Sequence, residues 1–341
     1  MKKLLLSLAL AFFSFPIFSV SLKDFSLSVE PLFGMKWGQI DEYVLAKESN
    51  FSDDKLSELN WEIKPELYGG LKIMGGWKGF FQESYFSAGI PMKSGQMFDS
   101  DWLNAMPYSL SPSDGVTYAN AVGHDYKTCY SEHDNYLEYD FSFGFKGGYE
   151  FKIFDIFKIK PSIAFEYQNI RFSGKDGEGW YGYGSRKKTG DYYSEYTDSQ
   201  YQTYKDFDGD VITYYRVSDF FWLGSDFSID LPKNFIVSAG FFFAPYVYAV
   251  SFDSHLERKV DFADKTTGYF SAFKWNFGAE YKITDRNSIL ISANYFYMKI
   301  LRGDSYKKTN SENTYTKITV SDGGAGANWF DLSISYKFKI F

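Results

Sequence analysis

The chain has 341 residues, a formal net charge of −7, a mean hydropathy of −0.32 and an aromatic fraction of 21%. Beyond the N-terminal segment no apolar run is long enough for a membrane helix, and the single Cys excludes an internal disulfide. The modest charge, without a basic block, gives no indication of nucleic-acid binding. A polar chain so rich in Tyr and Phe needs a fold that hides apolar surface without helices.

The N-terminal segment has the pattern of a secretory signal peptide, residues 1–21. Two Lys precede an apolar run over residues 4–20, and Ser19 and Ser21 place small residues at the −3 and −1 positions of a cleavage site. The alternative, a membrane anchor, is disfavoured because the run is short for a span and small residues close it. We therefore expect an exported mature chain, residues 22–341.

Alternation of apolar and polar residues with a period of two, the pattern of β-strands, continues through the rest of the chain. In residues 56–73, for example, the apolar side chains from Leu59 to Ile73 occupy odd positions and predict one apolar face. Ten such segments follow one another: 25–37, 56–73, 77–90, 136–150, 158–173, 211–228, 233–252, 267–283, 287–302 and 327–341.

The length of these segments separates a membrane barrel from a soluble sandwich. Several exceed ten residues, whereas sandwich strands have about five or six. A tilted strand of about nine to eleven residues crosses a bilayer. Such a sheet has to close, because lipid offers no hydrogen-bond partner to an open edge. Pro245 within 233–252 predicts a bulge or bend in that strand.

The gaps between the segments alternate in length. Short turns on one side and long polar loops on the other are typical of outer-membrane barrels, whose long loops face outward. An even number of strands leaves both termini on the inner side. The sequence therefore predicts an all-β fold, a ten-stranded antiparallel transmembrane β-barrel with long extracellular loops in the outer membrane. The long loops are predicted at 38–55, 91–135, 174–210, 253–266 and 303–326.

Two pairs of titratable residues follow outward strand ends. Asp253 and His255 stand two apart, in a chain with three His, and Asp99 and Asp101 stand two apart after the third segment. A spacing of two in an extended chain puts both side chains on one face. The third and seventh strands of a ten-stranded barrel lie across the lumen from each other, so the pairs are expected to face each other.

This group of four has the composition of a general acid–base site. Asp253 can polarise His255, which can then deprotonate a water. Asp99 and Asp101 are too close for both to ionise freely, so one can hold the water while the other protonates the leaving amine. The interpretation needs neither a covalent intermediate nor a metal.

Other interpretations of these residues stay open. Such pairs of Asp, or of Asp and His, also arise by chance in loops and strand caps, and carboxylates with a His can bind a divalent cation, although no closed ligand set is evident. His124 and His133 fall in the second long gap and are interpreted as solvated loop residues. Cys129 has no catalytic partner at a suitable spacing and receives no role.

At these residues the sequence resembles the omptin family, the ten-stranded outer-membrane aspartyl-type endopeptidases. DSDW at 99–102 is similar to the family's D-x-D-W motif, and DSH at 253–255 is similar to its D-x-H motif. The resemblance covers nearly the whole mature chain. It implies hydrolysis of peptide bonds in substrates at the cell surface, with Asp99, Asp101, Asp253 and His255 as the catalytic residues. Three further stretches resemble the family, at 55–64, 131–136 and 322–330.

The resemblance also implies a pocket that binds a basic residue at the cleaved bond through two acidic groups. Glu42 matches the position of the first, but Ser251 falls at the second and is not acidic. One carboxylate in place of two should weaken the capture of Arg or Lys. Cys129 falls where some members carry an Asp. No cofactor is implied, but family members depend on lipopolysaccharide bound by basic residues on the barrel exterior, and we do not match those residues one by one.

Two functions from other classes remain. The altered pocket and the long loop at 174–210 also fit a non-catalytic barrel that acts as an adhesin or binding protein. A diffusion pore is the other, although ten strands enclose little lumen and side chains fill much of it.

Overall fold

The computed structural model describes residues 25–47, 54–102, 126–182, 194–200 and 202–340 of the chain. These residues form one antiparallel sheet. Within the described ranges, no helix has the length and hydropathy that a membrane span requires. The predicted signal peptide lies outside the described residues and stays a prediction.

The sheet consists of strands that are mostly longer than twenty residues. In chain order they are β1 (Phe25–Ala46), β2 (Lys55–Trp77), β3 (Phe80–Gly89), β4 (Met92–Asp101), β5 (Cys129–Tyr149), β6 (Phe151–Lys152), β7 (Phe157–Tyr181), β8 (Thr203–Leu231), β9 (Phe235–His255), β10 (Val260–Gly268), β11 (Ala272–Lys282), β12 (Asn287–Thr309) and β13 (Thr316–Lys339).

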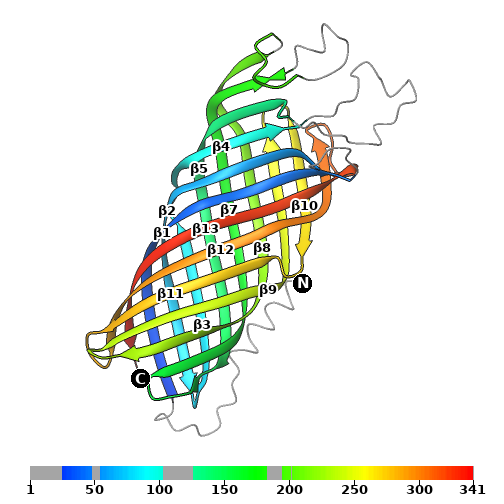
Figure 1. Cartoon of the computed structure of the whole chain (residues 1–341). Coiled ribbons are helices and arrows are strands. Elements are labelled where there is room, and N and C mark those ends of the chain that lie inside the picture. Colours follow the sequence, from blue (N-terminus) through cyan, green and yellow to red (C-terminus); the bar gives the residue numbers. More distant parts are fainter. Residues whose placement is uncertain (1–24, 48–53, 103–125, 183–193, 201, 341) are drawn as a thin grey trace.

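The sheet closes into a barrel of ten strands (Figure 1). β1 pairs with β2 on one side and with the last strand, β13, on the other, which closes the ring. β3 and β4 are two parts of the third barrel strand, β10 and β11 are two parts of the eighth, and β6 is a two-residue strand in the turn after β5. The predicted fold class is confirmed.

Most strands extend further outward than the sequence predicted. β1 runs to Ala46 instead of residue 37. The predicted long loop at 253–266 is wrong, because β9 runs to His255, β10 begins at Val260, and the two strands pair directly. These outer strand segments carry polar residues on their outward face, which is why their sequences were interpreted as loops.

A bulge in β2 switches the face on which its apolar residues lie. Trp61 and Ile63 point inward and are fully buried, whereas Leu71 and Ile73 point outward and are 41% and 42% exposed. The prediction of a single apolar face was therefore wrong. The register between β1 and β2 shifts by one residue at Lys64–Pro65, and with a period of two that shift exchanges the faces.

The bend predicted at Pro245 is confirmed by the register of β9. The pairing of β8 with β9 shifts between Phe221 and Leu223, opposite this proline. At the same place β9 changes its second partner from β10, which pairs with residues 247–255, to β11, which pairs with residues 235–244. A proline lacks the N–H needed for a continuous ladder, which accounts for the irregularity.

The half of the barrel that carries the short turns has an apolar outer surface. Phe33, Ile163, Ile291 and Ile334 are each about half exposed or more there (48%, 66%, 58% and 52%). A bilayer covers such a surface, since lipid-facing and lumen-facing residues alternate in membrane barrels. In the other half the apolar residues turn inward, so that half stands outside the membrane, on the side of the long loops.

Aromatic side chains fill the lumen between the two halves. The Trp61 ring stacks on both Phe172 and Tyr214, with its centroid 5.8 and 5.5 Å from theirs. Below this layer the rings of Phe296 and Trp329 stack with centroids 3.9 Å apart. All five belong to one buried cluster, which we call the aromatic plug.

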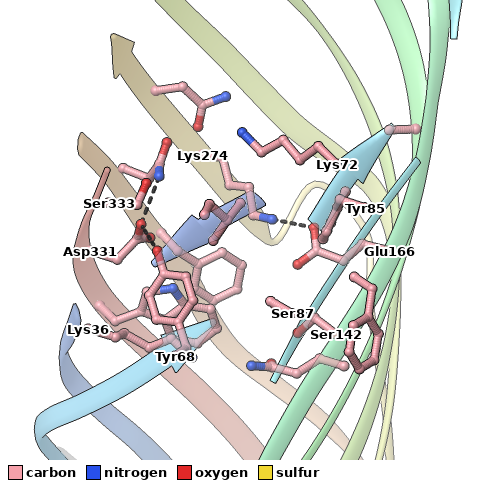
Figure 2. A pocket seen from close by; sticks show the side chains of 18 of the residues that line it. Lys36, Tyr68, Lys72, Tyr85, Ser87, Ser142, Glu166, Lys274, Asp331 and Ser333 are labelled. Atoms are coloured by element: carbon pink, nitrogen blue, oxygen red, sulfur yellow. Dashed lines mark hydrogen bonds and ion pairs between the residues drawn. The ribbon is translucent and has the colours of Figure 1, made fainter. Parts of the chain in front are cut away.

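A polar cavity of ≈ 230 Å³ lies in the lumen of the membrane half, below the aromatic plug. Lys36 Nζ lies 3.1 Å from Glu66 and 2.5 Å from Asp140. Figure 2 shows a second ion pair across the same cavity, between Lys274 and Glu166. Opposite charges therefore balance one another in this cavity, as buried charges require.

Candidate active site

Asp99 and Asp101 lie in β4, at the outer end of the third barrel strand. The sequence had placed them just past a strand end, but they are part of the ladder. Asp99 pairs with the buried Leu59, and Asp101 pairs with the buried Cys129. Because paired residues share a face of the sheet, both carboxyls point into the lumen, above the aromatic plug.

Asp253 and His255 lie at the outer end of β9. Asp253 Oδ2 is 2.8 Å from His255 Nε2, and their side chains are 3% and 13% exposed. The ring of Phe262, which pairs with Asp253, packs edge-on against the imidazole with centroids 5.6 Å apart. Asp253 thus fixes the orientation of the imidazole through Nε2, and Nδ1 is the ring nitrogen that Asp253 does not contact.

Arg258, in the turn between β9 and β10, contacts the same imidazole. Its Nη2 lies 3.0 Å from His255 Nε2 and also contacts Nδ1. When Nε2–H donates to Asp253, Nδ1 is the nitrogen that accepts from the guanidinium. Sequence reasoning missed Arg258 because its segment was predicted as an open loop, with no reason to bring it to the site.

Electrostatic coupling connects the two walls of the barrel. Burial, followed by the repulsion of the Asp99 carboxylate, raises the pKa of Asp101 to about 7. The hydrogen bond from Ser57 and the positive charge of Arg258 act in the opposite direction on the same pKa, as does His255 whenever it is protonated. Because Arg258 and His255 belong to the facing hairpin, the structure brings the four predicted residues to one outer mouth of the lumen.

Glu42 and Ser251 are buried below these pairs. Glu42 on β1 pairs with Leu59, and Ser251 on β9 lies two residues below Asp253. Burial, followed by the repulsion of the Asp253 and Asp264 carboxylates, raises the pKa of Glu42 well above its usual range.

Sequence reasoning missed two residues beside this pair. Ser251 lies between Arg216 on β8 and Asp264 on β10, which are its direct cross-strand partners. A charged residue on the inward face of an apolar strand could have revealed Arg216. Asp264 was hidden by the wrong loop prediction for 253–266.

His133 is a buried strand residue, and its prediction as a solvated loop residue was wrong. It lies in β5 and is 2% exposed, because β5 begins at Cys129 and not near residue 136. Its Nδ1 lies 2.5 Å from the Asp176 carbonyl oxygen and its Nε2 lies 2.9 Å from Ser131 Oγ. Ser131 pairs with Asp99, so His133 supports the wall that carries the acidic pair. His124 lies outside the described residues.

No metal centre accompanies these groups in the described ranges. No three or more His, Cys, Asp or Glu there are grouped closely enough to hold a metal ion. The arrangement offers a base with its carboxylate partner on one wall and two close carboxyls on the other, which suits acid–base chemistry.

Together, a closed barrel with a lipid-facing apolar surface and titratable pairs at its outer mouth define an outer-membrane β-barrel with a candidate hydrolytic site. The sequence matches the omptin family over residues 23–340. The chain belongs to the omptin family of outer-membrane proteases, and its location is the outer membrane.

One solved structure shares the fold. The outer membrane protease OmpT from Escherichia coli superposes with a TM-score of 0.73 at 14% identity, covering 94% of this chain and 99% of that one. The translocator domain of the autotransporter NalP from Neisseria meningitidis reaches a TM-score of 0.35 at 8% identity, covering 99% and 95%. A comparison with curated protein sequences finds no match.

Proposed function

We propose that this chain is an endopeptidase that cleaves exposed peptide bonds of proteins and peptides at the cell surface by attack of an activated water. The observation that carries the proposal is the arrangement at the outer mouth of the lumen, with Asp253 2.8 Å from His255 on one wall and the Asp99–Asp101 pair on the other. Membership of the omptin family supports the same reaction class.

In the proposed reaction, His255 Nδ1 takes a proton from water while Asp253 holds the opposite ring nitrogen. The hydroxide attacks the carbonyl carbon of the peptide bond and gives a tetrahedral intermediate. Asp101, protonated below its pKa of about 7, donates its proton to the leaving nitrogen as the C–N bond breaks, and Asp99 orients the water. His255 then returns its proton to Asp101 through solvent. The contact of Arg258 with Nδ1 has to open before water can bind there.

The substrate preference and the lipid requirement are parts of the same proposal. Glu42, buried beside the site, supports cleavage near basic residues. We propose lipopolysaccharide as an activator, and no cofactor in addition to it. Adding it to protein refolded in detergent should raise the rate of peptide cleavage, and an equal rate in its absence would remove it from the proposal.

The test of the activity is mass spectrometry of a peptide pool after incubation with refolded protein. We expect defined new termini with the wild type and none with His255→Ala. Asp261→Asn is the matched control, because Asp261 lies in β10 with an outward ion pair to Lys308 at 3.3 Å. Cleavage by His255→Ala at the wild-type rate would refute the mechanism, and heat-modifiable gel migration verifies that each variant folds.

A non-catalytic binding role has one specific observation in its favour. On the outward face of β4, β5, β7 and β8, four aromatic rings form a continuous row above the membrane half. Successive centroids lie 6.3, 5.9 and 5.9 Å apart, from Phe98 through Tyr130 and Trp180 to Tyr204. Tyr204 at the end of the row is 49% exposed and the other three rings are half-buried, so a partner could stack on its outer edge. Tight binding of a partner without turnover of any peptide would favour an adhesin over a protease.

A further inference from the structure

The four short turns, at the end of the barrel where the C-terminus lies (Figure 1), differ in the side chains at their tips. Three of them, which join β2 to β3, β8 to β9 and β11 to β12, have tips of Lys, Gly, Pro, Asn, Thr, Asp and Arg, at 78–79, 232–234 and 284–286. Such residues are usual in turns. The turn between β5 and β7, residues 150–156, instead has two Ile and a Phe at its tip, and we call it the apolar turn.

The side chains at the tip of the apolar turn are strongly exposed. Phe154 is 70% exposed, Ile156 55% and Ile153 49%. Backbone hydrogen bonds fix the turn in this position, since Ile153 N donates to the Phe157 carbonyl at 3.0 Å and Asp230 N on β8 donates to the Ile156 carbonyl at 2.8 Å. A fixed cluster of exposed apolar side chains marks a surface that a partner or a membrane covers.

The apolar turn continues the lipid-facing surface of the barrel without a break. Phe151, near its start, pairs with Ile159, which lies on the same outer face of β7 as the 66% exposed Ile163. On the other side, the ring of Tyr149 lies 4.8 Å from the ring of Phe151 and 4.9 Å from that of Phe80, as measured between centroids. The surface that covers the barrel wall is therefore the nearest one for the turn as well.

Two cationic side chains flank this surface. Lys152 lies in the apolar turn, and Lys233 lies in the β8–β9 turn, which the hydrogen bond from Asp230 joins to the apolar turn. Both are exposed, and within the described ranges neither has a carboxylate partner, since Asp230 is paired with Lys158 at 2.7 Å. A Lys beside apolar surface extends its ammonium group to the phosphates at a membrane boundary, and anionic lipids attract it.

We propose that the apolar turn is inserted into the phospholipid leaflet at the short-turn end of the barrel. Phe154 and Ile156 lie among the acyl chains, and Lys152 and Lys233 bind the phosphate groups of anionic lipids. The β11–β12 turn, four strands away in the ring of ten, has a polar tip and stays in water. The bilayer therefore extends further along the barrel on the side of β5 and β7, and the barrel axis is tilted toward that side.

The experiment compares one fluorophore at two matched positions. Asp155→Cys places it between Phe154 and Ile156 and keeps all the apolar side chains, and Asp285→Cys places it at the exposed tip of the β11–β12 turn. The wild type is the blank, because Cys129 is buried. In vesicles that contain anionic lipid, nitroxides on the acyl chains should quench nitrobenzoxadiazole about threefold more strongly at 155 than at 285, since an inserted segment lies about 5–10 Å into the boundary of headgroups and acyl chains.

Variants of the turn show whether its own side chains hold the label in lipid. Replacing Phe154 and Ile156 by Ser should abolish the extra quenching at 155, although the fluorophore is unchanged. Lys152→Gln with Lys233→Gln should weaken the quenching in anionic vesicles but not in zwitterionic ones. Heat-modifiable gel migration verifies the fold of each labelled variant.

The inference does not depend on the proposed peptidase function. Equal quenching of the two labels, or quenching at 155 that survives the Ser replacements, would overturn it. Quenching in anionic vesicles that the Lys replacements leave unchanged would overturn the assignment of the phosphate contacts. A label at 155 with the emission of water-exposed fluorophore would also overturn lipid insertion, and would identify the apolar turn as a docking surface for a protein.

Discussion

Among single residues, Asp101 is the one that the proposed mechanism makes the proton donor to the leaving amine. Burial and the repulsion of Asp99 raise its pKa, and the hydrogen bond from Ser57 and the positive charge of Arg258 limit the rise. In the proposed mechanism Asp101 acts while protonated. Activity is therefore expected below its pKa and lost above it, provided that the base on the facing wall is neutral.

The first prediction concerns the alkaline limb of the pH profile. Wild-type kcat/KM should fall as the pH rises through about 7, where Asp101 loses its proton. Arg258→Gln removes a charge that lowers this pKa, so the limb should move to higher pH. Stopped assays of one fluorogenic peptide across the pH range measure the alkaline limb of the wild type and of Arg258→Gln. A limb that stays in place, or moves to lower pH, contradicts the role of Asp101 as the acid.

At the scale of the strand, the bulge in β2 decides which side chains fill the lumen. It turns Trp61 inward, where its ring stacks on Phe172 and Tyr214 below the acidic pair. Tyr214 in turn pairs with Asp253 across β8 and β9. The ring of Trp61 thus supports both walls of the candidate site.

The second prediction is that Trp61→Ala destabilises the outer half of the barrel. Truncation of a fully buried Trp costs about 3–5 kcal/mol. Urea unfolding in lipid vesicles, followed by fluorescence, should show a loss of this size in the free energy of unfolding. Trp77→Ala is the control, because Trp77 is 41% exposed at the short-turn end and should cost much less. Equal losses for both variants would contradict a structural role for the aromatic plug.

How far the sequence could predict the strands depends on which face of each strand carries the apolar residues. The lipid-facing alternation predicted ten strands correctly, because outward apolar residues such as Ile291 and Ile334 alternate with polar ones. Beyond the membrane the apolar residues turn inward and the outward face is polar. Those segments therefore resemble loops, and His133 and Asp264 were hidden within them.

The candidate site was predicted from short motifs, and the structure places all four motif residues at one end of the lumen. Their proximity follows from strand order and register, which the count of strands already implied. Arg258 could not be predicted, since its position depends on a tight turn where a long loop was expected. Arg216 could have been noticed as a charged residue on an inward strand face, but its partner Ser251 depends on the exact pairing. A one-residue error in register would move each of these side chains to the other face.

At the scale of the whole molecule, the lumen of the barrel is blocked by the aromatic plug, and the candidate site lies at its outer mouth. The cavity in its membrane half is lined by balanced ion pairs, and the aromatic plug separates that cavity from the outer mouth. A continuous water path through the lumen would need these rings to move together. The architecture therefore disfavours the diffusion pore that composition alone left open.

The third prediction is that the protein does not conduct ions. Refolded wild-type protein inserted into planar bilayers should show no stable openings at moderate voltage, because packed rings exclude a hydrated ion. Paired replacement of Phe296 and Trp329 by Ala should produce measurable openings, since their stacked rings fill the lumen. Large, stable openings in the wild type would contradict the sealing role of the plug.

The central claim is that the two walls act on one water molecule, and a double-mutant cycle in kcat/KM tests it most directly. Asp101→Asn and His255→Ala should each lower kcat/KM by about 10²–10⁴, the range of general acid–base catalysis. The double variant should be scarcely slower than the slower single variant, because groups that act as a unit are not additive. Losses that multiply in the double variant, or either single variant with wild-type activity, would contradict the account.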